Sequence, residues 1–295
     1  MKYIKAKQIL SSYSSGDNWF GCNYNMNIYK GCNHGCIYCD SRSECYQVDN
    51  FTEIRAKENA LLILDKELKS KRKKGIVGTG AMSDPYNPCE SKYKLTRGAL
   101  ELINKYQFGV GLLTKSTLVL RDLDVLLKIK AINIAMVNFT ITTFDDSLGK
   151  IIEPHVDISS ERFKAVKSLS DAGILTGVLV WPLLPFINDT EANICGIIEK
   201  AAQCGAAFVI TYPGVTLRQN QRDYYFAQLD KFFPGLKEKY IKTYGLSYEC
   251  LSPNYHKLAE VAKETCQKYR LPYKMSDIVK VIRDANPVKQ LSLFD

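Results

Sequence analysis

The sequence lacks any run of 18 apolar residues, so we expect no membrane-spanning helix. No apolar stretch follows the first five residues, and we therefore expect no secretory signal and a cytoplasmic location. Low-complexity segments are also missing. With 46% apolar and 24% charged residues, the composition excludes disordered, collagen-like and coiled-coil proteins. Its 295 residues suffice for one large globular domain or two small ones.

Acidic residues are in the minority. The chain has 40 Lys and Arg against 31 Asp and Glu, a net charge of +9. This excess favours an anionic partner, and nucleic acid is the most common one. A solvated basic surface explains the same count, because the densest basic run, Lys66–Lys74, lies at a predicted helix end where cations complement the helix dipole.

Apolar strand-like runs alternate with amphipathic helical runs over most of the chain. The strands are predicted at Asn25–Tyr29, Gly75–Thr79, Phe108–Leu113, Ile134–Thr142, Ile174–Val180 and Ala207–Tyr212. The helices are predicted at Ile54–Lys73, Leu95–Tyr106, Asp122–Lys130, Ser160–Ala172 and Thr190–Cys204. Six such units predict parallel strands joined by right-handed crossovers. Periodicity alone allows either a doubly wound sheet or a partial barrel.

The alternation stops after Tyr212, and residues 219–272 have a helical, aromatic-rich pattern. We predict an α/β domain over residues 1–215, a helical extension over residues 216–285 packed on it, and an exposed tail over residues 286–295. Aromatic residues interleaved with lysines in this extension are able to stack on bases. More often, such aromatic residues belong to an ordinary core.

Cysteine is abundant, with ten in a chain that we expect to be reduced. Four of them, Cys32, Cys36, Cys39 and Cys45, fall within fourteen residues. Three thiolates on one tight loop can bind three irons of a [4Fe–4S] cluster and leave the fourth iron open. An open iron is a Lewis-acidic and redox-active site, able to chelate an amino and a carboxylate group.

Two alternatives use the same cysteines. A structural zinc ion needs four ligands, and His34 or Cys45 would complete such a site. However, no second cysteine pair follows at the usual distance. A closed electron-transfer cluster would take Cys45 as its fourth ligand.

The pattern from Cys32 to Cys39, with aromatic Tyr38 before the third cysteine, resembles the signature of radical S-adenosylmethionine (SAM) enzymes. The longer string from Tyr29 to Cys39 resembles the subfamily related to spore photoproduct lyase, which is also labelled DNA repair photolyase-like. Further similar segments are Gly78–Tyr86, Leu95–Arg97, Leu113–Asp122, Glu153-Pro154 and Gly173–Leu179. The resemblance covers about residues 24–215.

This resemblance implies a partial (β/α)6 barrel of the TIM-like type, bearing a [4Fe–4S] cluster on Cys32, Cys36 and Cys39. It also implies reductive cleavage of SAM to a 5′-deoxyadenosyl radical, with a flavodoxin or ferredoxin as electron donor. By motif match, SAM would contact five residues that lie at or near strand ends: Tyr38, Ser83, Asp84, Lys115 and Thr140. Tyr38 would lie beside the adenine, and Lys115 would meet the carboxylate. A plain turn at Ser83 and Asp84 and a solvated loop at Lys115 are the structural alternatives.

One position departs from the pattern of spore photoproduct lyase. That enzyme has a cysteine just before the Ser-Asp pair, where this chain has Ala81 and Met82. The nearest thiol, Cys89, is a weak candidate for the missing hydrogen-atom donor. We therefore expect a lyase-like or DNA repair enzyme acting on nucleic acid by a changed route. The alternatives are a radical SAM enzyme with a peptide, RNA or small-molecule substrate, and a non-catalytic iron–sulfur or zinc module.

The tail contains a further motif, Gln290-Leu291-Ser292-Leu293-Phe294. It resembles the pentapeptide with which bacterial polymerases and repair proteins bind the replication sliding clamp. Apolar anchors on a free terminus suit such a partner. Docking of the same residues on the protein's own surface is the alternative.

Overall fold

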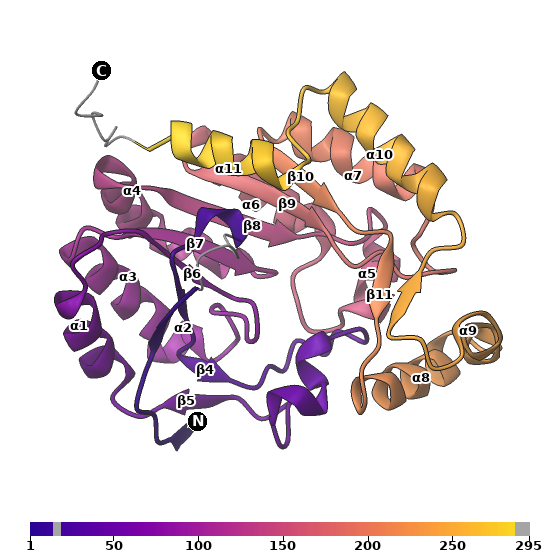
Figure 1. Cartoon of the computed structure of the whole chain (residues 1–295), viewed down its shortest axis with the longest axis horizontal. Coiled ribbons are helices and arrows are strands. Elements are labelled where there is room, and N and C mark those ends of the chain that lie inside the picture. Colours follow the sequence, from indigo (N-terminus) through magenta and orange to yellow (C-terminus); the bar gives the residue numbers. More distant parts are fainter. Residues whose placement is uncertain (14–18, 287–295) are drawn as a thin grey trace.

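The computed structural model describes residues 1–13 and 19–286. A seven-stranded sheet lies at the centre of the fold (Figure 1). Its order is β10-β9-β8-β7-β6-β3-β2, and every pair from β3 to β10 is parallel. The parallel strands are β3 (Tyr24–Met26), β6 (Ile76–Thr79), β7 (Gly109–Thr114), β8 (Ala135–Thr140), β9 (Leu175–Val180) and β10 (Phe208–Thr211). Antiparallel β2 (Leu10–Ser12) pairs with β3 at one edge.

Neighbouring parallel strands follow one another in chain order. A doubly wound sheet reverses its strand order at a switch point, and this sheet has no reversal. Within residues 1–13 and 19–286, no strand joins β10 to β2, so the sheet stays open. The fold is therefore the partial barrel that the resemblance predicts.

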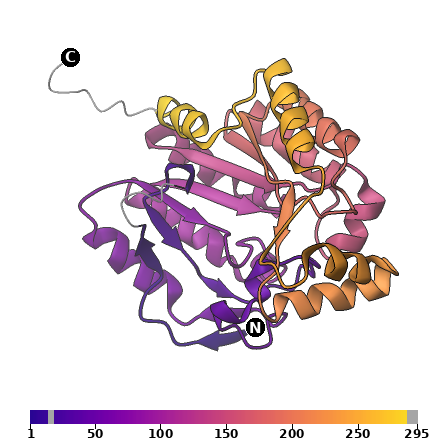
Figure 2. The ribbon, with the colours of Figure 1, turned by 45° about the vertical axis from the view of Figure 1, so that its right-hand side comes forward.

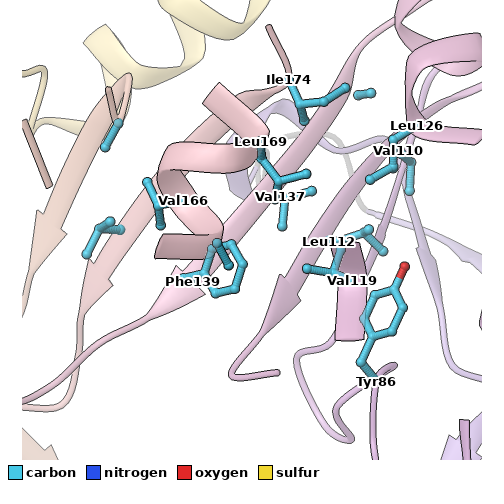
Figure 3. Packing of buried hydrophobic residues seen from close by; sticks show 14 of the residues in the cluster. Tyr86, Val110, Leu112, Val119, Leu126, Val137, Phe139, Val166, Leu169 and Ile174 are labelled. Carbon is cyan, nitrogen blue, oxygen red and sulfur yellow. The ribbon is translucent and has the colours of Figure 1, made fainter. Parts of the chain in front are cut away.

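Helices cover the outer face of the sheet (Figures 1 and 2). They are α1 (Ala60–Ser70), α3 (Leu95–Lys105), α4 (Leu123–Ile132), α6 (Ser159–Asp171) and α7 (Glu191–Gln203), with short α2 (Glu90–Tyr93), η4 (Thr117–Asp122) and α5 (Asp146–Ile152) between them. Alternate strand residues supply the core, because successive side chains point to opposite faces. Val137 and Phe139 of β8 thus face Val166 and Leu169 of α6 (Figure 3).

The inner face of the barrel is filled at the amino ends of its strands. There Met136 and Phe208 pack with Phe20 of η1 (Trp19–Gly21) and with Ile278 and Ile282 of α11 (Met275–Asp284). The carboxyl ends remain accessible, and barrel sites form at this end.

The predicted strand Asn25–Tyr29 is wrong as a single element. It divides into β3 and β4 (Tyr29–Lys30), and β4 pairs with β5 (Arg55–Lys57) in a separate sheet with β1 (Lys2–Ile4). The helix predicted from Ile54 consequently begins only at Ala60. Ala56 is buried between two less buried neighbours, the alternation of a strand rather than a helix. Two short 3-10 helices, η2 (Asp40–Arg42) and η3 (Glu44–Tyr46), lie between β4 and β5.

The C-terminal region contains the expected helices α8 (Gln221–Phe232), α9 (Leu236–Tyr244) and α10 (Tyr255–Lys268). An antiparallel pair that the sequence did not predict, β11 (Gly214–Thr216) and β12 (Glu249–Leu251), lies among them. Helix α10 packs against α7 on the outer face, whereas α8 and α9 pack on each other (Figure 1). The predicted domain boundary at residue 215 falls within β11, and the division into domains stays a prediction.

The sliding-clamp motif, Gln290–Phe294, lies outside the described residues. Within the described ranges, no helix combines the length and apolarity needed to cross a membrane.

Candidate active site at the carboxyl ends of the strands

A cavity of about 390 Å³ opens at the carboxyl ends of the parallel strands. This volume lies within the range of small-molecule sites, roughly 300–1,000 Å³. Its lining includes most of the residues predicted from the sequence: Cys32, Cys36, Cys39, Ser83, Asp84, Lys115 and Thr140. The fold therefore brings together side chains from distant parts of the sequence.

The cluster loop, residues 31–39, follows β4 and depends on two glycines with positive φ. Gly31 has a φ of 82°, and a Cβ there would lie 2.4 Å from the carbonyl oxygen of Glu53. Gly35 has a φ of 73°, and its Cβ would lie 2.9 Å from a ring carbon of Pro154. Both positions require glycine, since side chains rarely adopt this φ and the backbone approaches closely.

A strap formed by residues 152–155 holds this loop from the other side. The amide of Ile37 donates to the carbonyl of Ile152 at 3.0 Å, and the amide of His155 donates to the carbonyl of His34 at 3.1 Å. Backbone bonds at both ends of the strap fix the loop on either side of its second cysteine.

Glu153 lies between these two backbone bonds and is almost fully buried. Its Oε2 is 2.6 Å from Nη1 of Arg162, whose side chain is only 1% exposed. Its Oε1 accepts a hydrogen bond from the hydroxyl of Tyr38. Arg162 Nη1 also donates to the carbonyl of Thr140 at 2.9 Å. The carboxylate thus joins the cluster loop, helix α6 and the end of β8.

The charge state of this network follows from its partners. Burial alone would raise the pKa of Glu153, but Arg162 and Lys115 hold it below its usual range. Burial and the neighbouring carboxylate raise the pKa of Tyr38 well above 10. Glu153 is therefore ionised and Tyr38 is the proton donor. In the sequence, Glu153-Pro154 is only one of the segments that resemble the subfamily, and this resemblance predicts no role for the carboxylate.

Ser83 and Asp84 already have protein partners. The Ser83 hydroxyl donates to the carbonyl of Gly31 at 2.6 Å. Asp84 accepts from the Thr114 hydroxyl at 2.7 Å and from the Lys115 amide at 2.8 Å. These bonds fix the segment after β6 against the cluster loop and the end of β7. Contact of Ser83 and Asp84 with SAM stays a prediction.

Lys115 carries a cation at the cavity wall. Its Nζ lies 5.8 Å from the ring centroid of Tyr38. Burial lowers its pKa, but nearby negative charge, including that of the ionised Glu153, outweighs this and the pKa is raised. A protonated amine in this position suits a carboxylate ligand. Contact of Lys115 with the carboxylate of SAM stays a prediction.

The three cysteines fit a [4Fe–4S] cluster in their chemistry. All are free thiols that line one cavity from one loop. Burial raises the pKa of Cys32 to about 11, and it also raises the pKa values of Cys36 and Cys39. Because irons bind thiolates, loading would release these protons.

Of the two candidate fourth ligands, His34 lines the cavity and Cys45 does not. Cys45 is exposed, and its sulfur is 3.1 Å from Nη1 of Arg218 rather than at the cavity. His34 turns its Nδ1 to within 3.6 Å of Asp84. Outside the undescribed segments, no three His, Cys, Asp or Glu side chains are grouped to hold a single metal ion. A structural zinc site requires converging ligands, whereas each cluster thiolate binds its own iron. The open cluster on three cysteines stays a prediction.

Cys89 lies at the N-terminus of α2 and packs against the main core. It does not line the cavity, whereas Ala81 and Met82 do. Its role as hydrogen-atom donor stays a prediction that this geometry does not support.

A sequence model of the Radical SAM superfamily matches residues 26–196. The chain belongs to the radical SAM superfamily. A relative in Methanocaldococcus jannaschii, itself uncharacterized, is 36% identical over 174 residues, which are 58% of this chain and 64% of that protein. An uncharacterized protein of Mycobacterium bovis is 27% identical over 256 residues, covering 84% of this chain and 75% of its own.

Solved radical SAM structures share the fold. Spore photoproduct lyase, in complex with a dinucleoside spore photoproduct, superposes with a TM-score of 0.63 at 16% identity, over 90% of this chain and 79% of that one. The methyltransferase TsrM of Kitasatospora setae superposes with a TM-score of 0.56 at 11% identity, over 82% and 51% of the two chains. Members of the superfamily use a [4Fe–4S] cluster and SAM, and this chain is a radical SAM enzyme.

Replacing Cys32, Cys36 or Cys39 with Ala should abolish iron binding after anaerobic reconstitution. The unchanged protein should hold about four irons per chain, as should the matched control Cys45→Ala. Iron and sulfide analysis measures both. Loss of the cluster in Cys45→Ala would contradict the assignment of three ligands.

Glu153→Gln should destabilise the metal-free protein by about 3–5 kcal/mol, because it leaves the Arg162 cation buried without its partner. Urea denaturation measures this change. The control is Glu161→Gln on the helix that carries Arg162, where an exposed pair with Lys164 at 2.6 Å is lost. That control should cost less than about 1 kcal/mol. Equal stability of the two variants would show that the strap does not depend on the ion pair.

Proposed function

We propose that this radical SAM enzyme acts on nucleic acid, in a lyase-like or DNA repair reaction. The observation that carries the proposal is the pairing of arginines with tyrosines, one pair at the edge of the cavity and one between η2 and α8. Proteins that bind single strands combine cations that follow the phosphates with aromatic rings that stack on bases. The net charge of +9 is consistent with such a partner.

Two arginines form these pairs. Arg218 Nη2 donates to the hydroxyl of Tyr248 at 2.9 Å, and its Nε lies 3.4 Å from Asp40. Tyr248 and Asp40 both line the cavity, so Arg218 lies at its edge. Arg42 of η2 stacks with its guanidinium carbon 3.8 Å from the ring centroid of Tyr224. Helix α8 and η2 hold this second pair together.

The residues of the site have separable roles in this chemistry. Cys32, Cys36 and Cys39 would hold the cluster, and the cation of Lys115 would hold the carboxylate of SAM. Once bound, the cluster and SAM supply an electron and a carbon radical that removes a hydrogen atom from the substrate. Glu153 keeps the cluster loop in place. Ser83 and Asp84 fix the segment after β6 against that loop and the end of β7. Fixed positions matter because hydrogen transfer requires close approach of the reacting atoms.

Spore photoproduct lyase, which shares this fold, has been solved in complex with a dinucleoside spore photoproduct. This likeness supports the proposal of a nucleic-acid substrate for this chain. Ala81 and Met82 argue against an identical route, because neither side chain can return a hydrogen atom as a thiol does. A peptide, RNA or small-molecule substrate is the alternative. Membership of the superfamily leaves no ground for the non-catalytic module.

Three partners complete the proposal. Nucleic acid would be the substrate, and flavodoxin or ferredoxin would supply the electron. The motif Gln290–Phe294 would tether the enzyme to the sliding clamp. The clamp can be tested separately from the other two partners, because its motif is one contiguous peptide whereas substrate and electron donor require the folded site.

The anaerobically reconstituted protein should convert SAM to 5′-deoxyadenosine when dithionite is added, as chromatography of the products would show. It should also bind a fluorescein-labelled single-stranded oligodeoxythymidylate with an affinity that falls as salt rises, since phosphate contacts release counterions. Absence of 5′-deoxyadenosine would contradict the radical activity. Cleavage without salt-dependent oligonucleotide binding would contradict only the choice of nucleic acid.

A further inference from the structure

Four aromatic side chains from separate segments lie at the cavity or pack against a residue that lines it. We call them the aromatic rim: Trp19, Trp181, Tyr212 and Tyr248. Trp19 belongs to η1, Trp181 follows β9, Tyr212 follows β10 and Tyr248 precedes β12. Trp19, Trp181 and Tyr248 line the cavity itself. The rim thus includes both tryptophans of the chain.

Three rings of the rim, those of Trp19, Trp181 and Tyr212, pack against one another. Trp181 and Tyr212 lie with centroids 5.0 Å apart and planes tilted by 32°. Trp19 meets Trp181 edge-on at 5.5 Å and 73°. Trp19 also packs edge-on against buried Phe20 at 5.0 Å. These contacts hold the three rings on the barrel, which limits the entropy lost when a ligand binds.

Core packing does not account for the rim. Trp19 is 39% exposed and Tyr248 is 46% exposed, although both line the cavity of the site. Aromatic residues of this size dominate cores when they are buried. Here, substantial ring surface remains available to a planar ligand.

We propose that the aromatic rim holds a nucleobase of the substrate, unstacked from its strand, above the cofactor end of the cavity. The inference rests on the proposed nucleic-acid substrate and names how that substrate is held. The cysteines, Lys115 and Thr140 lie in the same cavity, so a base on the rim is presented to the reactive end. A base within a duplex cannot reach such a pocket, and enzymes that modify bases take them out of the stack.

Arg218 supplies the second half of this recognition. Its guanidinium carbon lies 5.1 Å from the Tyr248 ring centroid, so a cation flanks the rim where a base enters. A nucleotide held on the rim therefore places its phosphate toward Arg218. Stacking by the rim and a phosphate contact by Arg218 distinguish a nucleotide from a simple apolar ligand.

Trp19→Leu and Tyr248→Leu, each in the reconstituted full-length protein, should weaken binding of the labelled oligodeoxythymidylate. The loss should be about 5- to 100-fold, the effect of removing one stacked base contact. Trp19→Phe keeps a stacking face and should restore most of the affinity. Tyr3→Leu is the control, because Tyr3 is 52% exposed on β1 and does not line the cavity. Arg218→Gln should lower the salt dependence by about one phosphate contact.

Three results would overturn the proposal, and they are distinguishable. If the unchanged protein cleaves SAM but binds no oligonucleotide, the nucleic-acid function fails and the rim proposal fails with it. If it binds in a salt-dependent manner but both Leu variants bind equally well, only the rim proposal fails. If the Leu variants lose affinity for SAM in a separate titration and keep that for the oligonucleotide, the rim holds the cofactor instead.

Discussion

The buried ion pair between Glu153 and Arg162 is the interaction on which the site depends. Taking both charges out of water costs several kcal/mol per ion, and the pair is retained only because each group has further hydrogen-bond partners. Tyr38 donates to the carboxylate, and the guanidinium donates to the backbone at Thr140. The pair therefore couples the position of the cluster loop to the end of a central barrel strand. It adds a side-chain link to the backbone bonds that hold the loop against residues 152–155.

The open barrel explains why such a loop is useful. Parallel strands in chain order place their carboxyl ends around one space, and four of them, β6 to β9, end in or lead into segments that line the cavity. Apolar side chains fill the amino end of the inner face, while polar side chains remain at the other end. The barrel thus supports a pocket with a solid floor and an accessible mouth. Substrate recognition then depends on segments outside the parallel strands, among them η1 and the residue before β12.

Much of this arrangement is predictable from the sequence because its signals are local. Apolar runs reveal the parallel strands from β6 to β10, and residues soon after them, such as Asp84 and Lys115, belong to the same end of a barrel. The cysteine spacing is equally local. Pairings over long distances are not predictable: Tyr38 and Glu153 are 115 residues apart, and neither side chain alone indicates the other. Strands β4, β5, β11 and β12 have two or three residues each, too few to show a period.

The aromatic rim was not predictable from the sequence for the same reason, because its four rings come from four separate segments. The central claim is that three cysteines on a fixed loop leave one iron of the cluster open to SAM. Mössbauer spectroscopy of the protein loaded with iron-57 tests it most directly, with and without SAM. We expect one iron in about four to change its signal when SAM is added. If none of the four iron signals changes when SAM is added, or if the protein takes up zinc in place of iron, the open-iron assignment is contradicted.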